Sequence, residues 1–82
     1  MRRPILAGNW KMNKTTADAV DFVRSIRRGL NNVKDVDRVL CPPFTALAPL
    51  KEILSATEIG LGAQNMYWEE KGAYTGEVSP LM

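Results

Sequence analysis

The sequence predicts an α/β fold in which short buried strands alternate with amphipathic helices. Three short apolar runs end in Gly, Asn or Pro, and two stretches with helical spacing lie between them. A composition of 45% hydrophobic and 24% charged residues is typical of a packed domain. Because parallel strands need a long crossover between them, this order predicts βαβ units with right-handed connections. At 82 residues the chain forms at most one small domain.

The first strand is predicted over residues 4–10, a short apolar run that follows two arginines. The first helix begins at Thr15 or Thr16, either of which can cap it. Acidic residues come early in this helix and arginines late, which is the order that the helix dipole favours. Gly29 and the asparagines at 31–32 predict its end. The apolar positions at helical spacing are Ala19, Phe22, Val23, Ile26 and Leu30.

The second strand is predicted over residues 36–41, where Pro42 and Pro43 close it. A shorter helix follows over residues 45–54, with leucines along one stripe. Proline fits a helix only in or near its first turn, because it has no N–H to donate. We therefore expect Pro49 to impose an irregular or 3₁₀ start on this helix.

The third strand is predicted over residues 59–65, and the stretch 66–78 after it has neither helical nor alternating spacing. This stretch predicts a long loop whose aromatic residues favour protein contact over disorder. Ser79 and Pro80 form a pair that commonly opens a helix, although the sequence ends at Met82. We therefore expect the start of a further helix there.

Strands in sequential order would place both helices on one face of the sheet. Parallel sheets are almost always covered on both faces, so three strands with one bare face and two open edges indicate part of a larger unit. An open doubly wound sheet and a closed (β/α)₈ barrel would both supply the missing cover.

Composition excludes several classes of partner and site. A net charge of +2, evenly spread, indicates neither a nucleic-acid footprint nor an anionic membrane. Cys41 is the single cysteine and there is no histidine, so the sequence offers no disulfide and lacks the commonest general base and metal ligand. The N-terminal apolar run is too short for a signal peptide, and no stretch is long and apolar enough to span a membrane. The cytoplasm is therefore the expected compartment.

Polar side chains follow the first and third strands. Asn9 and Lys11 come just past the first strand, where α/β proteins place ligand-binding groups. Residues two apart on an extended chain point the same way, so this pair would offer an amide and a cation to one anionic substrate. An exposed lysine beside a turn asparagine is the simpler alternative. For Gln64 and Asn65, two amides that satisfy loop backbone groups are the favoured interpretation.

Four segments in order closely resemble the start of the triosephosphate isomerases. They are residues 8–13 (GNWKMN), 41–43 (CPP), 62–65 (GAQN) and 72–79 (GAYTGEVS). The resemblance covers the whole chain and implies the first three βα units of a (β/α)₈ TIM barrel, βαβαβ plus the start of a further helix. Residues 1–82 would then be the N-terminal third of a single barrel domain of roughly 250 residues.

The resemblance implies that glyceraldehyde 3-phosphate and dihydroxyacetone phosphate are interconverted by proton transfer through an enediolate, in glycolysis and gluconeogenesis. No metal or organic cofactor is implied. Lys11 would hold the dianionic substrate and stabilise the enediolate, and Asn9 would place the substrate oxygens. A fixed cation aimed at developing negative charge is worth roughly 10²–10³ in rate.

The resemblance also implies a homodimer. The loop from residue 66 to residue 79 would be an arm whose tip, Thr75, reaches the active-site pocket of the partner subunit. The residues implied at the dimer interface are Met12, Gln64, Asn65, Tyr74, Thr75 and Gly76.

The glutamate base, the histidine electrophile, the closing lid and the glycine-rich phosphate site of that family would lie beyond Met82. The chain alone is therefore expected to be inactive. Two other functions stay open for this chain. It could be a non-catalytic module whose aromatic loop binds another protein, or a small phosphate-binding α/β module.

Overall fold

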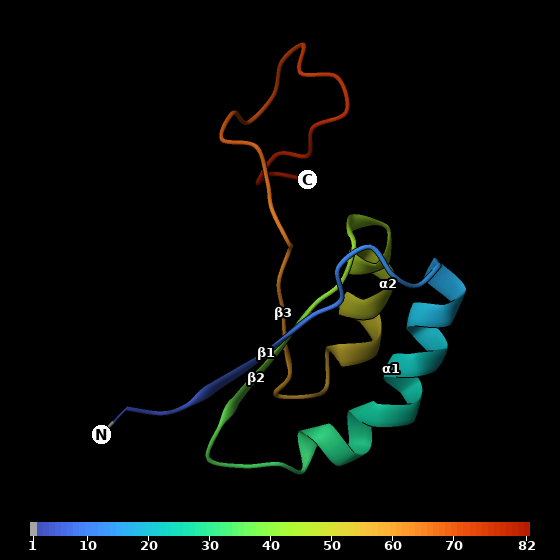
Figure 1. The fold of residues 1–82 in the computed structure, drawn as a ribbon, viewed down its shortest axis with the longest axis vertical. Helices are drawn as coiled ribbons and strands as arrows, with labels where there is room; N and C mark the ends of the chain where they lie inside the picture. Colours follow the sequence, from blue (N-terminus) through green and yellow to red (C-terminus); the bar gives the residue numbers. More distant parts are fainter. Residues whose placement is uncertain (1) are drawn as a thin grey trace.

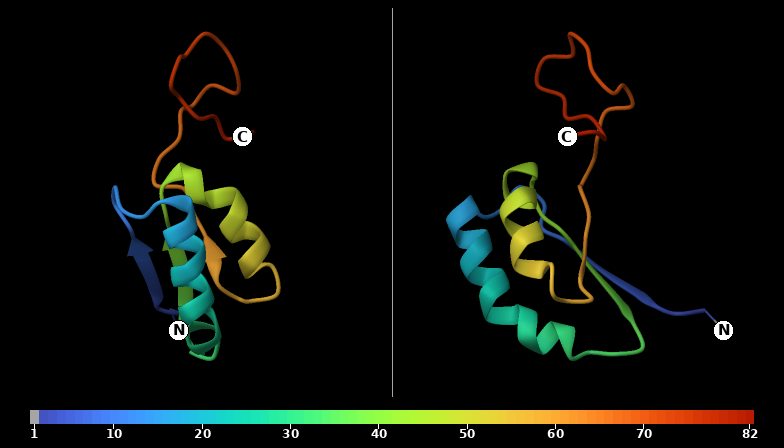
Figure 2. Two further views of the ribbon diagram at one scale, coloured as in Figure 1. Left: turned by 90° about the vertical axis from the view of Figure 1, so that its right-hand side faces the viewer. Right: turned by 180° about the vertical axis from the view of Figure 1, so that it is seen from behind.

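The structure, a computed structural model, describes residues 2–82 and has the predicted alternation of strands and helices (Figure 1). Its elements are β1 (Ile5–Asn9), α1 (Thr16–Asn31), β2 (Asp37–Cys41), α2 (Phe44–Leu54) and β3 (Gly60–Leu61). The three strands are parallel and lie in the order β1-β2-β3. Both helices lie on one face of this sheet (Figure 2). The predicted α/β class, strand order and one-sided helical layer are confirmed.

The core lies between the two helices and the face of the sheet that they cover. β1 pairs with β2 along its whole length, from Ile5 opposite Asp37 to Asn9 opposite Cys41. The central strand β2 buries Leu40 beneath the helices. The buried apolar residues are Ala19, Val23, Leu40, Ala46, Leu50, Leu54 and Ile59. Two of the positions predicted for α1 are therefore fully buried, while Phe22, at the margin of the layer, stays 39% exposed.

Side chains fix both ends of α1. Thr15 is the N-cap, and its hydroxyl accepts the backbone N–H of Asp18 at 3.1 Å. Asn32 is the C-cap, as the sequence predicts. Gly29 lies inside the last turn and does not end the helix, so that part of the predicted stop signal is wrong. A glycine ends a helix when it adopts a left-handed conformation just past the last turn.

Arg38 ties β2 to the end of α1. Its guanidinium is buried, and Nη1 donates to the carbonyls of Leu30 and Asn31 at 3.0 Å each. These carbonyls belong to the last turn, where the regular helical bonds end, and the carbonyl of Leu30 also accepts the N–H of Val33 at 3.2 Å. A charged residue inside a predicted strand therefore completes the helix that precedes it, a role that the strand pattern does not reveal.

Pro49 lies in the second turn of α2, and the helix is an α-helix from Phe44 onward, although its first turn holds one bond of the 3₁₀ type. The predicted 3₁₀ start is therefore confirmed only in that one bond, and the rest of the helix is regular. A proline at 49 has no N–H to give to the carbonyl of Thr45. The hydroxyl of Thr16 on α1 donates to that carbonyl at 3.2 Å instead. A contact between helices replaces the bond that the proline removes.

The third strand is shorter than predicted, with two residues in place of seven. Within residues 2–82, β3 is an edge strand paired with β2, and β2 ends at Cys41. One further bond, from the N–H of Gly62 to the carbonyl of Leu40 at 2.9 Å, extends the pairing before the chain turns away. The predicted helix start at the end of the sequence is a single turn closed by Met82 N–H and the Ser79 carbonyl at 3.1 Å.

The first strand leaves apolar side chains open to solvent. Ile5 is 68% exposed and Leu6 is 63% exposed. An open groove of about 440 Å³ runs between β1 and α1, with Leu6, Trp10 and Phe22 among its lining residues. Within residues 2–82, neither helix is both long enough and apolar enough to cross a membrane.

Replacing Thr16 tests how α2 accommodates its proline. Thr16→Val is expected to lower the free energy of unfolding by about 0.5–1.5 kcal/mol, because the carbonyl of Thr45 loses its donor. Pro49→Ala restores a backbone N–H to that carbonyl, so the same threonine substitution should cost less in that background. Urea unfolding of the four variants, followed by circular dichroism at one protein concentration, measures both costs. Equal costs in the two backgrounds would contradict this account of the helix.

Candidate active site

Hydrogen bonds tie the carboxyl ends of the three strands together. The carbonyl of Cys41, the last residue of β2, accepts the backbone N–H of Trp10 at 3.1 Å and Nε2 of Gln64 at 2.9 Å. The same Nε2 donates to the carbonyl of Lys11 at 2.9 Å. The amide of Gln64, on the segment after β3, therefore satisfies backbone groups as the sequence predicts, and it joins β2 to the segment after β1. Asn65 is exposed.

Lys11 has a left-handed backbone, with φ of +58°. This conformation is uncommon for a residue with a side chain and costs about 1–2 kcal/mol. The backbone N–H of Lys11 donates to Oδ1 of Asn9 at 2.9 Å, and Gln64 bonds its carbonyl. The expectation of an extended chain from Asn9 to Lys11 is therefore wrong. β1 ends at Asn9, and a turn closed by the asparagine side chain sets the direction of the lysine.

Lys11 carries an unopposed positive charge in the part of the chain that the structure describes. The three ion pairs within residues 2–82 join other side chains, and all three lie toward the amino ends of the strands: Arg3 with Asp37, Lys34 with Glu58, and Arg38 with Glu58. Both Lys11 and Asn9 are exposed. Their end of the sheet therefore exposes one cation and one amide.

The segment 66–79, here called the arm, extends beyond the carboxyl ends of the strands (Figure 1). Its base is closed by a bond from the N–H of Tyr67 to the carbonyl of Val78 at 2.8 Å. The tip is a turn in which the N–H of Glu77 reaches the carbonyl of Tyr74 at 3.0 Å. The rings of the two tyrosines lie 4.6 Å apart between centroids. The predicted long loop is thus confirmed, and its own aromatic residues pack inside it.

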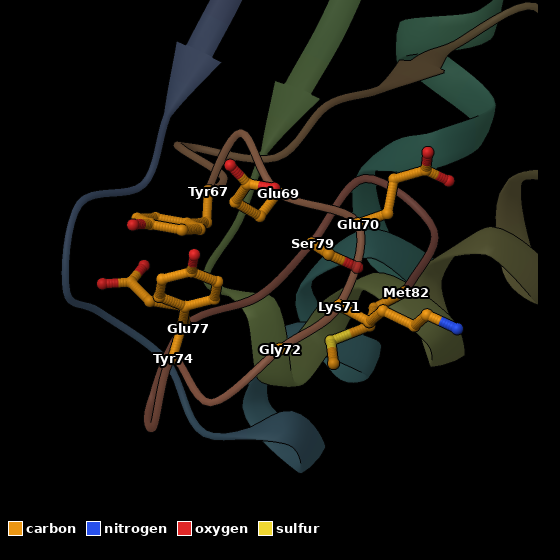
Figure 3. Close-up of a pocket in the computed structure, with 9 residues that line it drawn as sticks. All are labelled: Tyr67, Glu69, Glu70, Lys71, Gly72, Tyr74, Glu77, Ser79 and Met82. Atoms are coloured by element: carbon orange, nitrogen blue, oxygen red, sulfur yellow. The ribbon is translucent and has the colours of Figure 1, made fainter.

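The arm encloses a hollow of about 160 Å³ (Figure 3). Gly72 lies below the ring of Tyr74 with φ of +147°, and a Cβ atom there would come within 2.7 Å of that ring. The strand-end residues Asn9 and Lys11 are not part of this hollow, so we assign it no chemistry. Its lining residues are Tyr67, Glu69, Glu70, Lys71, Gly72, Tyr74, Glu77, Ser79 and Met82.

The structure brings some of the predicted site residues together and leaves others apart. Asn9, Lys11 and Gln64 form one hydrogen-bonded group, and Met12 beside them is 96% exposed. The predicted interface residues Tyr74, Thr75 and Gly76 lie in the arm, away from this group (Figure 1).

Sequence reasoning missed two contributors to the loop that carries Lys11. One is the carbonyl of Cys41, and the other is Asn13, whose Nδ2 donates to the carbonyl of Trp10 at 2.7 Å. The asparagine is a residue type typical of turns, which was the signal available for it. Within residues 2–82, no group of three or more acidic, histidine or cysteine side chains could hold a metal ion.

The parallel alternation of strands and helices defines the class: these are the first βα units of a (β/α)₈ barrel. The structure matches the crystal structure of triosephosphate isomerase from Bartonella henselae with a TM-score of 0.84. That match covers 94% of this chain and 31% of the other, at 36% sequence identity.

The sequence comparisons agree with the structural one. The model of the family described as triosephosphate isomerase matches residues 4–82. Curated triosephosphate isomerases from Carboxydothermus hydrogenoformans and Dehalococcoides mccartyi are 56% and 52% identical to this chain over all 82 residues. The chain belongs to the triosephosphate isomerase family. It spans 33% of the length of these two relatives.

Proposed function

We propose that this chain supplies the first active-site loop of an enzyme that interconverts glyceraldehyde 3-phosphate and dihydroxyacetone phosphate. The observation that carries the proposal is the state of Lys11: an exposed cation, outside every ion pair within residues 2–82, held in a left-handed conformation at the carboxyl end of β1. Backbone conformations of this kind cluster at functional sites, where surrounding contacts maintain them. Membership of the triosephosphate isomerase family supports the substrate class.

The proposed chemistry follows from the charge that develops during the reaction. Removing a proton next to a carbonyl leaves negative charge on oxygen, and the ammonium of Lys11 would stabilise that charge while holding the phosphorylated substrate. Oδ1 of Asn9 already accepts the Lys11 N–H, so its Nδ2 is the group that would donate to substrate oxygens. A preorganised cation of this kind is worth roughly 10²–10³ in rate.

We assign the glutamate base and the histidine electrophile to parts of the whole enzyme outside this chain, since the matched relatives are about three times as long. We place the reaction in glycolysis and gluconeogenesis, in the cytoplasm, without a metal or organic cofactor.

We further propose a homodimer in which the arm of one subunit enters the active-site region of the other. The arm extends away from its own strand ends, and its Trp68 is 79% exposed (Figure 1). Met12, beside Lys11, is 96% exposed. Large exposed apolar side chains of this kind are typical of interaction surfaces. Thr75 would enter the pocket of the partner subunit, flanked by Tyr74 and Gly76, with Met12, Gln64 and Asn65 near the entrance.

A chimera tests the role of Lys11. In it, residues 1–82 of this chain replace the matching third of the Carboxydothermus hydrogenoformans isomerase. Lys11→Ala in the chimera is expected to lower kcat/KM by at least roughly 10², because the transition state loses its charge partner. Coupled turnover of glyceraldehyde 3-phosphate, with enzyme from a host that lacks its own isomerase, measures the loss.

Lys51→Ala is the matched control for that substitution, because Lys51 is an exposed lysine on α2 and should leave kcat/KM unchanged. Near-normal turnover by the Lys11 variant would remove this residue from the site and contradict the role proposed for it.

The 82-residue chain alone is expected to show no isomerase turnover. Proton abstraction needs a positioned base within roughly 3 Å of the carbon-bound proton. Among the described carboxylates, Asp37 and Glu58 pair with cations at the opposite end of the strands, and Glu69, Glu70 and Glu77 line the hollow of the arm. The assay uses purified chain, with its Lys11→Ala version as the control for contaminating enzyme. Turnover that rises with chain concentration and vanishes in that control would refute the expectation.

Thr75→Arg tests the arm in the chimera. A charged side chain at the arm tip would have to be buried in the pocket of the partner subunit, so the Kd of the dimer is expected to rise at least about thirtyfold. Sedimentation velocity over a range of concentrations measures the Kd. Ser25→Arg, on the exposed side of α1, is the control and should leave the dimer intact. An unchanged Kd for the Thr75 variant would contradict the proposed role of the arm.

A further inference from the structure

The loop between β1 and α1 holds two residues in unfavourable backbone conformations. Lys11 has φ of +58° and Lys14 has φ of +78°. Left-handed conformations are disfavoured for residues that carry a Cβ atom, so contacts elsewhere must maintain both of them. Asn9 and Gln64 bond the backbone of Lys11 directly. Other contacts must hold Lys14 and the rest of the loop.

The ring of Phe22 contacts both ends of this loop. The indole of Trp10 meets it edge to face, with 5.6 Å between centroids and 81° between planes. On the other side of the loop, Nζ of Lys14 lies 4.9 Å from the centroid of the Phe22 ring, a cation–π contact. Phe22 belongs to α1, whose neighbouring side chains Ala19 and Val23 are fully buried. One ring on the helix therefore contacts the residue before Lys11 and Lys14, the residue before the N-cap.

Trp10 links the Phe22 ring to Lys11, because its indole packs on that ring and its backbone directly precedes the lysine. Its backbone N–H bonds the carbonyl of Cys41 at 3.1 Å, and its carbonyl accepts Nδ2 of Asn13 at 2.7 Å. The two peptides that flank Trp10 are therefore both held: β2 bonds the one before it, Asn13 bonds the one that enters Lys11, and the indole between them packs on Phe22. A shift of the indole would move the peptide that carries the lysine.

We infer that Phe22 is a positioning residue that acts through Trp10 and Lys14 to hold Lys11 in place for its substrate. The inference rests on the proposed function of Lys11. The role assigned to Phe22 rests on its two contacts with the loop, the indole of Trp10 and Nζ of Lys14, and involves no contact of its own with the substrate. The ring of Phe22 packs against the loop that precedes α1.

Kinetics of the chimera test this inference. Phe22→Leu keeps an apolar side chain but removes both aromatic contacts, and kcat/KM is expected to fall about tenfold. Phe22→Tyr keeps the ring and should restore kcat/KM to within about twofold of the unmodified chimera. Phe44→Leu is the matched control, because Phe44 is the other phenylalanine, has a similar exposure of 36% and lies at the start of α2. The control should be as active as the unmodified chimera.

A double substitution separates positioning from a general loss of structure. If Phe22 acts through Lys11, then Phe22→Leu should change kcat/KM by less than about twofold in the Lys11→Ala background. The same tenfold loss in both backgrounds, or no loss in the single variant, would overturn the inference. Near-normal turnover by Lys11→Ala alone would instead overturn the proposed function. The two failures are therefore distinguishable.

Lys14→Met provides a readout that does not depend on replacing the ring. Lys14 is exposed, so this variant should fold, and losing the cation–π contact is expected to lower kcat/KM about threefold. If Phe22→Leu does not fold, this variant decides the matter. Unchanged turnover by Lys14→Met would then overturn the inference.

Discussion

A single carbonyl oxygen, that of Cys41, joins the carboxyl ends of all three strands. It accepts Trp10 N–H from the segment after β1 and Nε2 of Gln64 from the segment after β3. The position of that oxygen is fixed by the parallel register that sets Asn9 opposite Cys41. Because Gln64 also bonds the carbonyl of Lys11, the register of the sheet determines where the loop with the lysine lies. The site is thus a consequence of strand pairing.

Magnitudes explain why Lys11 can stay in a disfavoured conformation. A left-handed residue with a side chain costs about 1–2 kcal/mol, whereas each neutral hydrogen bond contributes about 0.5–1.5 kcal/mol. Three such bonds hold this turn: Asn9 to Lys11, Gln64 to Lys11, and Gln64 to Cys41. Together they match or exceed the cost of the conformation. The backbone turn therefore sets the direction of Lys11. Its charge has no counter-ion within residues 2–82.

The helices and strands that depend on residues close together in the sequence were predicted correctly. The bounds of α1, β1 and β2 lie within a residue or two of those expected, because capping, helical spacing and apolar runs specify them. The regular helix around Pro49 and the short β3 were not predicted, since the first depends on a hydroxyl from α1 and the second on where its partner strand ends. Asn9 and Lys11 were predicted as site residues from their place at the end of a strand, and that role stays a prediction; no sequence pattern signals a left-handed lysine. The roles of the predicted interface residues remain predictions.

The most direct test of this account is a crystal structure of the chimera with dihydroxyacetone phosphate bound. The account predicts Nζ of Lys11 and Nδ2 of Asn9 within about 3 Å of ligand oxygens. It also predicts that Lys11 keeps a positive φ and that the Gln64 bonds to the Lys11 and Cys41 carbonyls are present. A ligand bound elsewhere, or an extended Lys11 with these bonds broken, would contradict the claim that strand pairing positions the lysine for its substrate.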